Sequence, residues 1–282
     1  MNKVKILVAC HKKSEVFHND VYIPIHVGKE LHPDLDLGFI GDNVGDNISY
    51  KNPYYSELTA QYWGWKNLDC EYIGLCHYRR YFSKEITISN VDQEMDGFDI
   101  ILASSVAYPK SIFTRWENDL VNGDIHIFYQ YMITRFPDMR NEIDSFFIQN
   151  NRYNPANMFL CKKELFDDFA EWQFSILFDL EKYILKSEYS RPRRLFGYLS
   201  EGLLPFYMKL NGLRIKEMPL VSMIGDSQEI LYDSLKSRIK NWLYFERKKR
   251  FFEYHLPDDV RVSLVNAGVF EKLQKEFPSL KR

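Results

Sequence analysis

Residues 42–82 read DNVGDNISYKNPYYSELTAQYWGWKNLDCEYIGLCHYRRYF, and three different patterns follow one another along them. A polar turn over 42–47 comes first, and its Asp and Asn side chains are typical of turns because they bond to nearby backbone. Apolar residues at helical spacing then predict a helix over 55–68. A short apolar strand over 72–76 follows and leads straight into the histidine, tyrosine and two arginines of 77–80. Ligands bind outside the carboxyl ends of the strands in an open α/β sheet, so this order predicts an anion-binding site there.

Three cationic side chains stand at the end of this strand, namely His77, Arg79 and Arg80. The planar guanidinium of arginine binds phosphate through two parallel hydrogen bonds, and the neighbouring tyrosines can stack on a base or a sugar. If the strand continues through this segment, His77 and Arg79 share one face and Arg80 takes the other, so that one of the two arginines reaches the ligand. The alternative is that the arginines pair with nearby carboxylates and serve only the fold.

A second cationic strand end is expected near the N-terminus. The apolar run over 4–9 predicts a central parallel strand buried on both faces, and His11 and Lys12 follow it. Further strands are predicted over 37–40, 72–76, 98–103, 158–161 and 213–220, with helices over 111–150, 162–186 and 191–210 between them. Strands that alternate with helices indicate an α/β fold with a mostly parallel sheet flanked by helices. We expect one such domain over 1–225 and a helical extension over 226–282.

Composition and charge limit the class of protein. The net charge of −2 and the pI near 6.4 argue against a dedicated nucleic-acid binder, whose domain is normally basic. The four cysteines are scattered and are expected to be reduced thiols rather than zinc ligands. The N-terminal apolar run is too short for a signal peptide or a membrane span, and no later segment approaches spanning length. These features predict a cytoplasmic protein.

Two further groups of side chains could carry chemistry. The turn residues could bind a ribose, a sugar hydroxyl or a metal, or they could simply build the turn; they are Asp42, Asn43, Asp46 and Asn47. The Asp-x-Asp pair at 34–36 comes before a strand rather than after one, so it is not expected to bind a metal. Glu201 stands in an apolar helix, where partial burial would raise the pKa of a carboxyl group and suit it to be a general base. An exposed helical glutamate is the alternative.

Residues 234–250 change the character of the chain. They are rich in Lys and Arg, and Ile239, Trp242, Leu243 and Phe245 are interleaved with these cations. Such a basic amphipathic helix can lie on an anionic membrane surface, which would make the protein peripheral on the inner face of the cytoplasmic membrane. A solvated helix docked on its own domain is the alternative.

Three stretches resemble a bacterial family of capsular and exopolysaccharide glycosyltransferases, long catalogued as a domain of unknown function, some of whose members are assigned as galactofuranosyltransferases. They are DNVGDNIS…ELTAQYWGWKNL…YIGLCHYRRYF, NPANMFLCKKELF and RRLFGYLSEGLL. The resemblance covers about residues 3–225 and implies a GT-A-like nucleotide-sugar fold. It also implies that Glu201 is the catalytic base and that Asn154, Asn157 and Arg194 contact the acceptor or the donor sugar.

The resemblance further implies a hexosyl transfer from a UDP-sugar donor, galactofuranose included, to a lipid-linked glycan, with inversion at the anomeric carbon. The donor diphosphate is expected to lie near His77, Arg79 and Arg80. Because this segment replaces the Asp-x-Asp of GT-A enzymes, the two arginines could neutralise the diphosphate without Mn²⁺ or Mg²⁺, and the metal requirement stays open. A non-catalytic glycan-binding module, a sugar-phosphate transferase and an RNA-binding protein are the competing hypotheses.

Overall fold

The computed structural model describes residues 2–187, 189, 193–224, 227–231, 234–244 and 254–278. The chain divides into two compact units that interleave along the sequence. Unit 1 comprises Met1–Val106, Asn154–Phe174 and Arg194–Ile239, and unit 2 comprises Ala107–Tyr153, Ser175–Arg193 and Lys240–Arg282. This division differs from the single boundary that the sequence predicted at residue 225.

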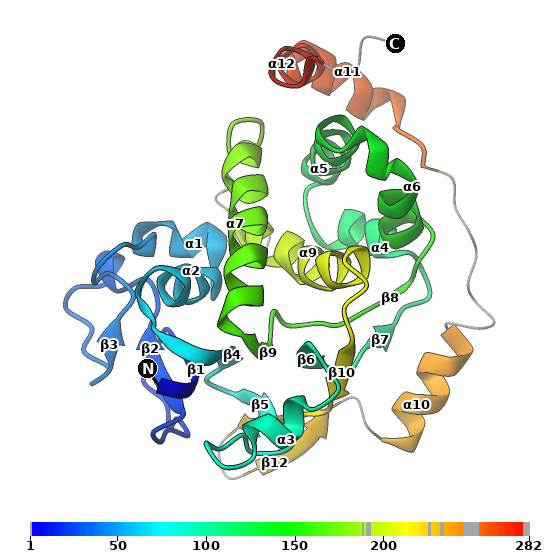
Figure 1. The fold of residues 1–282 in the computed structure, drawn as a ribbon. Coiled ribbons are helices and arrows are strands. Elements are labelled where there is room, and N and C mark those ends of the chain that lie inside the picture. The colour runs from blue at the N-terminus through cyan, green and yellow to red at the C-terminus, as the bar shows by residue number, and fades with distance from the viewer. Residues whose placement is uncertain are drawn as a thin grey trace. The chain divides into compact units, whose positions relative to one another are not determined.

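Unit 1 is built on a large mixed sheet (Figure 1). Its strands are Asn2–Cys10 (β1), Tyr22–His26 (β2), Ile40–Gly41 (β3), Cys70–His77 (β4), Arg80–Phe82 (β5), Ile100–Ala103 (β6), Phe159–Lys162 (β9), Ile215–Met218 (β10), Leu220–Ile224 (β11) and Ser227–Leu231 (β12). The main order is β10-β6-β9-β4-β1-β2-β3. Strands β1 to β4 are parallel, as are β6 and β10, whereas β9 is antiparallel to both of its neighbours. The predicted α/β class with a mostly parallel sheet is therefore confirmed.

The helices flank this sheet or form the second unit. Those with residues in unit 1 are Asn52–Tyr55 (α1), Leu58–Asn67 (α2), Val91–Met95 (α3), Lys163–Leu180 (α7), Leu195–Leu210 (α9) and Leu235–Trp242 (α10), and α7 and α10 also contribute residues to unit 2. Unit 2 contains Ile112–Asp119 (α4), Asn122–Arg135 (α5), Arg140–Ile143 (α6), a π-helical turn at Asp144–Ile148, Asp258–Asn266 (α11) and Val269–Glu276 (α12). Strand β7 (Val106–Ala107) pairs with β8 (Arg152–Tyr153) in a small separate sheet.

Strand β1 is buried on both faces, as its continuous apolar sequence predicted. Val4, Ile6 and Val8 alternate onto one face and join a buried cluster that includes residues of α3. On the other face, Leu7 lies against α2 at Gly64, where an added Cβ would come within 2.8 Å of Leu7 Cδ1. Glycine at this position therefore lets the helix pack close to the sheet.

Two expectations from the sequence differ from the structure. No strand was predicted between residues 14 and 36, yet this segment contains β2 with Pro24 inside it. Strand β3 pairs only with Ile25 and His26, so Pro24 faces no ladder partner on that side and its missing N–H is tolerated. The helix predicted over 55–68 is split into α1 and α2 at Ser56, whose φ of 52° interrupts the helical backbone.

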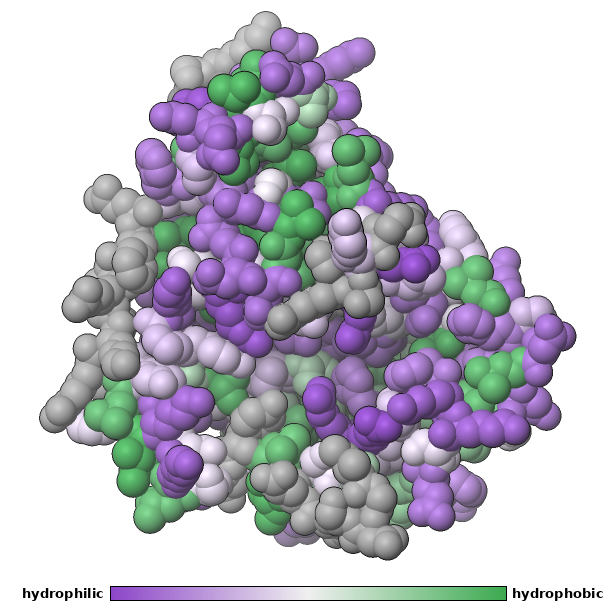
Figure 2. Space-filling model, turned by 180° about the vertical axis from the view of Figure 1, so that it is seen from behind, coloured by the Kyte–Doolittle hydropathy of each residue, from purple (hydrophilic) through white to green (hydrophobic). Residues whose placement is uncertain are grey.

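Hydrophilic residues cover most of the face drawn in Figure 2, and hydrophobic residues occur there in small groups. Among the residues that the structure describes, none of the helices is both long enough and apolar enough to cross a membrane.

Candidate functional site

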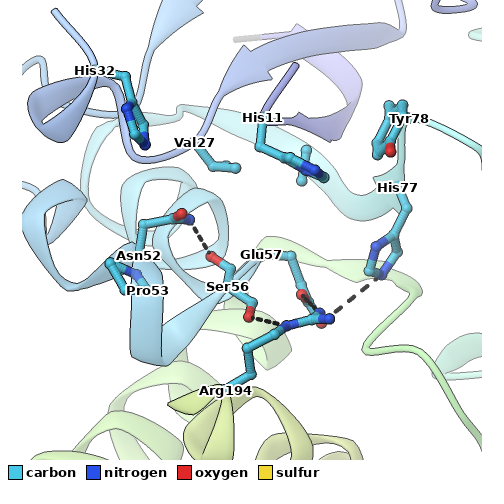
Figure 3. A pocket seen from close by; sticks show the side chains of 11 residues that line it. His11, Val27, His32, Asn52, Pro53, Ser56, Glu57, His77, Tyr78 and Arg194 are labelled. Carbon is cyan, nitrogen blue, oxygen red and sulfur yellow. Dashed lines mark hydrogen bonds and ion pairs between the residues drawn. The ribbon is translucent and has the colours of Figure 1, made fainter. Parts of the chain in front are cut away.

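A cavity of about 320 Å³ lies at the carboxyl ends of β1, β2 and β4. Parallel strands end at the same edge of a sheet, so the residues that follow these three strands meet there. The segment that joins α1 to α2 forms another wall, and Arg194 reaches in from the start of α9 (Figure 3). The side chains that line the cavity belong to Ala9, His11, Val27, His32, Asn52, Pro53, Ser56, Glu57, His77, Tyr78 and Arg194.

Basic side chains gather around His11 at one side of this cavity. The rings of His11 and Tyr78 meet edge to face with centroids 5.2 Å apart, and the Arg79 guanidinium lies 4.9 Å from the centroid of the Tyr78 ring. Partial burial lowers the pKa of His11 below 6.5, and the charges of Lys12, Arg194 and Arg79 lower it further. This imidazole is therefore neutral at pH 7 in the free site. The neighbouring positive charges of Lys12, Arg79 and Arg194 are the ones that would attract an anion.

Arg194 is held over the cavity by the close approach of α9 to α1. Tyr55 and Phe196 stack with ring centroids 4.8 Å apart, and an added Cβ on Gly197 would lie 3.4 Å from Ser56 Oγ. Arg194 Nε donates a hydrogen bond to Ser56 Oγ at 2.9 Å. The predicted sugar-binding arginine is therefore placed at the site, with its guanidinium beside the α1–α2 junction (Figure 3).

Glu57 is the one carboxylic acid among the described residues that line the cavity. It is only 7% exposed, and Arg194 and His77 each lie 3.9 Å from one of its carboxylate oxygens. Its Oε1 accepts a hydrogen bond of 2.7 Å from Asn157 Nδ2, and its Oε2 lies 3.9 Å from Arg194 Nη2. That second distance is beyond a hydrogen bond, so a polar group of a ligand could bind between the carboxylate and the guanidinium.

His77 faces the same carboxylate from the end of β4. Its Nε2 lies 3.9 Å from Glu57 Oε1 and 2.7 Å from the carbonyl oxygen of Ala156. Because a carbonyl oxygen can only accept, Nε2 carries the hydrogen and donates it to Ala156. The prediction that His77 stands at a ligand site at this strand end agrees with its place in the cavity wall.

The two arginines after His77 do not continue the strand, and the predicted alternation of faces is wrong for this segment. Tyr78 and Arg79 form a turn, and β5 runs back so that Arg80 pairs with His77. Arg80 also pairs with Ser222 on β11 and is exposed. Neither arginine is among the described residues lining the cavity, although Arg79 lies close enough to lower the pKa of His11.

The polar turn at 42–47 is held together by its own contacts. Asp42 is fully buried, and its carboxylate accepts hydrogen bonds from the backbone N–H groups of Gly28 and Lys29 and from the hydroxyl of Ser49. Asp46 accepts a hydrogen bond from Tyr62, and Asn47 bonds to backbone within the turn. Asn43 is exposed. These contacts favour the structural interpretation, in which Asp42 fixes the ends of β2 and β3 rather than a ligand.

The asparagines predicted to contact the acceptor or the donor sugar are both buried, and neither is among the described residues that line the cavity. Asn154 Nδ2 donates to the Ala103 carbonyl at 2.7 Å and to Glu217 Oε1 at 3.2 Å. Asn157, which is 1% exposed, holds Glu57. The predicted base Glu201 is half-buried on α9 and is not among the described residues that line the cavity.

Sequence reasoning missed Glu57, Ser56 and His32 as residues of this site. Glu57 stands in the stretch YYSELTAQ, where it looks like an ordinary helical glutamate, because its hydrogen-bond partner Asn157 is 100 residues away. The one local signal was the position of Ser56 and Glu57, directly after a short helical turn that begins with a proline. This position agrees with a break between two helices.

Metal binding has no obvious place among the described residues, where no group of three or more His, Cys, Asp or Glu side chains could hold a metal ion. The cavity itself offers His11, His32, His77 and Glu57, but no such cluster.

Comparisons with known proteins identify one matching protein family and a similar solved structure. The sequence profile of a family described as a domain of unknown function (DUF4422) matches residues 5–212. The apo structure of the bifunctional glycosyltransferase WbbM superimposes with a TM-score of 0.72 at 29% sequence identity, over 83% of this chain and 48% of that one. The chain thus spans about half the length of this relative. No curated protein matches the chain. The expected GT-A-like architecture is confirmed by this likeness.

Proposed function

The chain belongs to the protein family described as a domain of unknown function (DUF4422), and we propose that it is a glycosyltransferase that binds its nucleotide-sugar donor in the cavity at the carboxyl ends of β1, β2 and β4. The similarity to a bifunctional glycosyltransferase supports this class of reaction.

The observation that carries the proposal is the charge of this cavity. The guanidinium of Arg194 lines it, and the charges of Lys12 and Arg79 stand close by. The imidazole rings of His11 and His77 also line it. Fixed cations at a strand end stabilise a bound diphosphate and, during transfer, the negative charge that develops on the leaving diphosphate. The cavity volume of about 320 Å³ lies at the lower end of the range of about 300–1,000 Å³ for small-molecule sites.

The finer assignment rests on the sequence resemblance. The donor is a UDP-hexose, with UDP-galactofuranose the first to test, and the acceptor is a lipid-linked glycan of capsule, exopolysaccharide or O-antigen synthesis. A single displacement inverts the anomeric carbon. The basic side chains of the site carry the diphosphate, so that Mn²⁺ or Mg²⁺ is an addition to be tested and not a requirement.

We also propose that α10 brings the enzyme to the membrane that holds such an acceptor. Leu235, Ile239 and Trp242 are 74%, 50% and 53% exposed and fall on one face of the helix at a spacing of four and three residues. Lys236, Arg238 and Lys240 flank this face on the same helix. Exposed apolar side chains flanked by cations complement an anionic lipid surface. The basic residues predicted to extend this helix over 245–250 lie outside the described residues.

A thermal-shift panel of nucleotides and UDP-sugars, with Mn²⁺ and with EDTA, tests the donor site. A ligand at a hundredfold excess over its Kd stabilises the folded protein by about 2.7 kcal/mol, which raises Tm by several degrees. We expect UDP and at least one UDP-sugar to do so, Arg194→Gln to weaken the shift, and Arg261→Gln, an exposed arginine on α11, to leave it unchanged.

Other outcomes would identify the competing functions. A shift with free glycans and with none of the nucleotides would indicate a glycan-binding module and overturn the proposal. Release of UMP rather than UDP from the donor would indicate a sugar-phosphate transferase. A shift that disappears with EDTA and returns with Mn²⁺ would establish that the metal takes part.

A further inference from the structure

Behind Glu57 lies a chain of buried polar side chains that the proposed donor site does not explain. Gln61 Nε2 donates to Gln173 Oε1 at 2.5 Å, Gln173 Nε2 donates to Ser200 Oγ, and Ser200 Oγ donates to Asn157 Oδ1 at 2.8 Å. Asn157 Nδ2 then donates to Glu57 Oε1 at 2.7 Å. These five residues come from α2, α7, α9, the loop before β9 and the α1–α2 junction, and each is at most 7% exposed.

The hydrogen bonds of this network all point the same way, because in each of them the donor is the residue farther from Glu57 along the network. Ser200 occupies Asn157 Oδ1, so the amide of Asn157 must turn its NH₂ group to Glu57. The same NH₂ group also donates to the Gly197 carbonyl at 3.0 Å, which fixes it from α9. Polar groups in a buried network orient one another, so this arrangement holds one oxygen of Glu57 in place and leaves the other toward Arg194 and the cavity.

Unfavourable backbone geometry surrounds the same carboxylate. Ser56, Ala156 and Asn157 have φ values of 52°, 78° and 46°, in a region that residues with a Cβ rarely adopt. These conformations aim the Ala156 carbonyl at His77 and the Asn157 side chain at Glu57. Backbone strain of about 1–3 kcal/mol per residue persists where the surrounding structure enforces it, and it is concentrated at functional sites.

From this arrangement we infer that Glu57, and not Glu201, is the catalytic base, and that Asn157 is its positioning residue; the inference rests on the proposed glycosyltransferase function. The acceptor hydroxyl gives its proton to Glu57 Oε2 while its oxygen forms a bond to the anomeric carbon. The bond between that carbon and the diphosphate oxygen breaks, and the nucleoside diphosphate leaves with the electron pair. Glu57 lines the cavity, and the 3.9 Å between its Oε2 and Arg194 Nη2 leaves room for an acceptor hydroxyl to reach that oxygen.

Four variants test the assignment, with the UDP-sugar that gives the largest thermal shift as donor. The rate is the release of UDP, first with water as acceptor and then with an octyl galactoside. A positioned general base contributes about 10²–10⁴-fold, so Glu57→Gln should lose at least a hundredfold in kcat while keeping its thermal shift with UDP. Glu201→Gln should stay within about threefold of the native rate, and Glu171→Gln, an exposed glutamate on α7, is the matched control.

Asn157→Asp tests the positioning role through the kcat–pH profile, which would not change if Asn157 served only the fold. It puts a second carboxylate in contact with Glu57, and the two like charges raise the pKa of the pair. Since only the ionised base works, the acidic limb of the kcat–pH profile should shift to higher pH, and the rate should recover in alkaline solution. An unshifted profile would remove Asn157 from this role.

The two proposals fail in different ways. If none of the nucleotides or UDP-sugars binds, the glycosyltransferase proposal and this inference fall together. If UDP-sugar binds and is turned over, but Glu57→Gln retains a near-native rate, the inference alone is overturned. A rate lost in Glu201→Gln and kept in Glu57→Gln would restore the base predicted from the sequence.

Discussion

The imidazole of His11 should make ligand binding depend on pH. Its pKa is held below 6.5 by burial and by neighbouring cations, so it is neutral in the free protein at pH 7. An anion bound beside it would raise that pKa, and binding would then be accompanied by proton uptake. The affinity for UDP should therefore rise as the pH falls through the raised pKa of the complex toward the lower pKa of the free protein, by up to roughly tenfold for each unit of pKa change.

Isothermal titration at pH 7.5 and 5.5 measures this dependence, with His11→Asn as the comparison. UDP titrates in the same range, but its own contribution is the same for both proteins. The variant should keep only that shared part. Equal pH dependence in the native protein and in His11→Asn would show that the imidazole does not meet the anion.

At the scale of elements, the loop before β9 has a backbone conformation with positive φ that its residues rarely adopt. Ala156 has a φ of 78°, which glycine adopts without steric cost. Ala156→Gly should relieve strain of about 1–3 kcal/mol and lose about 0.4–1 kcal/mol through the freer unfolded chain. The buried methyl group of Ala156 is lost as well, at a cost of about 0.8 kcal/mol. We therefore expect a small net rise, of less than about 1 kcal/mol, in the free energy of unfolding, measured by denaturant titration. Ala170→Gly, inside α7, should instead destabilise the protein, and a loss in both would contradict the argument.

The sequence predicted elements wherever local pattern decides them. The apolar run of β1 and the helical spacing of α7 and α9 specify their structure without reference to distant residues. The turn at Tyr78 and Arg79 contains no glycine or proline, and β5 folds back there because β11, about 140 residues later, pairs with it. A pairing of that range leaves no mark on the local sequence.

Contacts between residues far apart in the sequence also limited what could be predicted of the site. His11 and His77 could be singled out because basic side chains that follow apolar strands form a local pattern, whereas Arg194 was named only from the family resemblance. Glu57 could not be singled out, because its burial and its hydrogen bonds come from Asn157 and, through it, from α9 and α7. The resemblance implied that Asn157 contacts the acceptor or the donor sugar; the structure buries its side chain, which bonds to Glu57.

At the scale of the whole molecule, the two units interleave along the chain because residues 154–174 and 194–239 return to the sheet of unit 1. Such returns are contacts between distant segments, whereas the composition changes only near residue 226. A boundary drawn from composition therefore falls at the basic region and misses the helical unit formed by 107–153, 175–193 and 240–282.

The basic region predicts a behaviour of the whole molecule on membranes. Flotation with vesicles containing 30% phosphatidylglycerol should recover the native protein at low salt and much less of it at high salt, because surface charges are screened. The double variant Leu235→Ser, Ile239→Ser should float poorly. Val262→Ser, Val265→Ser removes two apolar side chains of similar exposure, 58% each, from α11 and should float like the native protein. Flotation that the α10 changes leave untouched would rule out α10 as the docking surface.

All four thiols of the chain are buried in unit 1, and burial raises the pKa of Cys10 to about 12 and that of Cys70 to about 11. Cys76 and Cys161, which lie deeper, are shifted in the same direction. Only the thiolate reacts with maleimides at an appreciable rate, so the native thiols will label slowly. A cysteine introduced on the exposed surface of each unit would then carry a fluorophore without removal of the native ones. Energy transfer between two such dyes would report how the distance between the units responds to donor and acceptor during turnover.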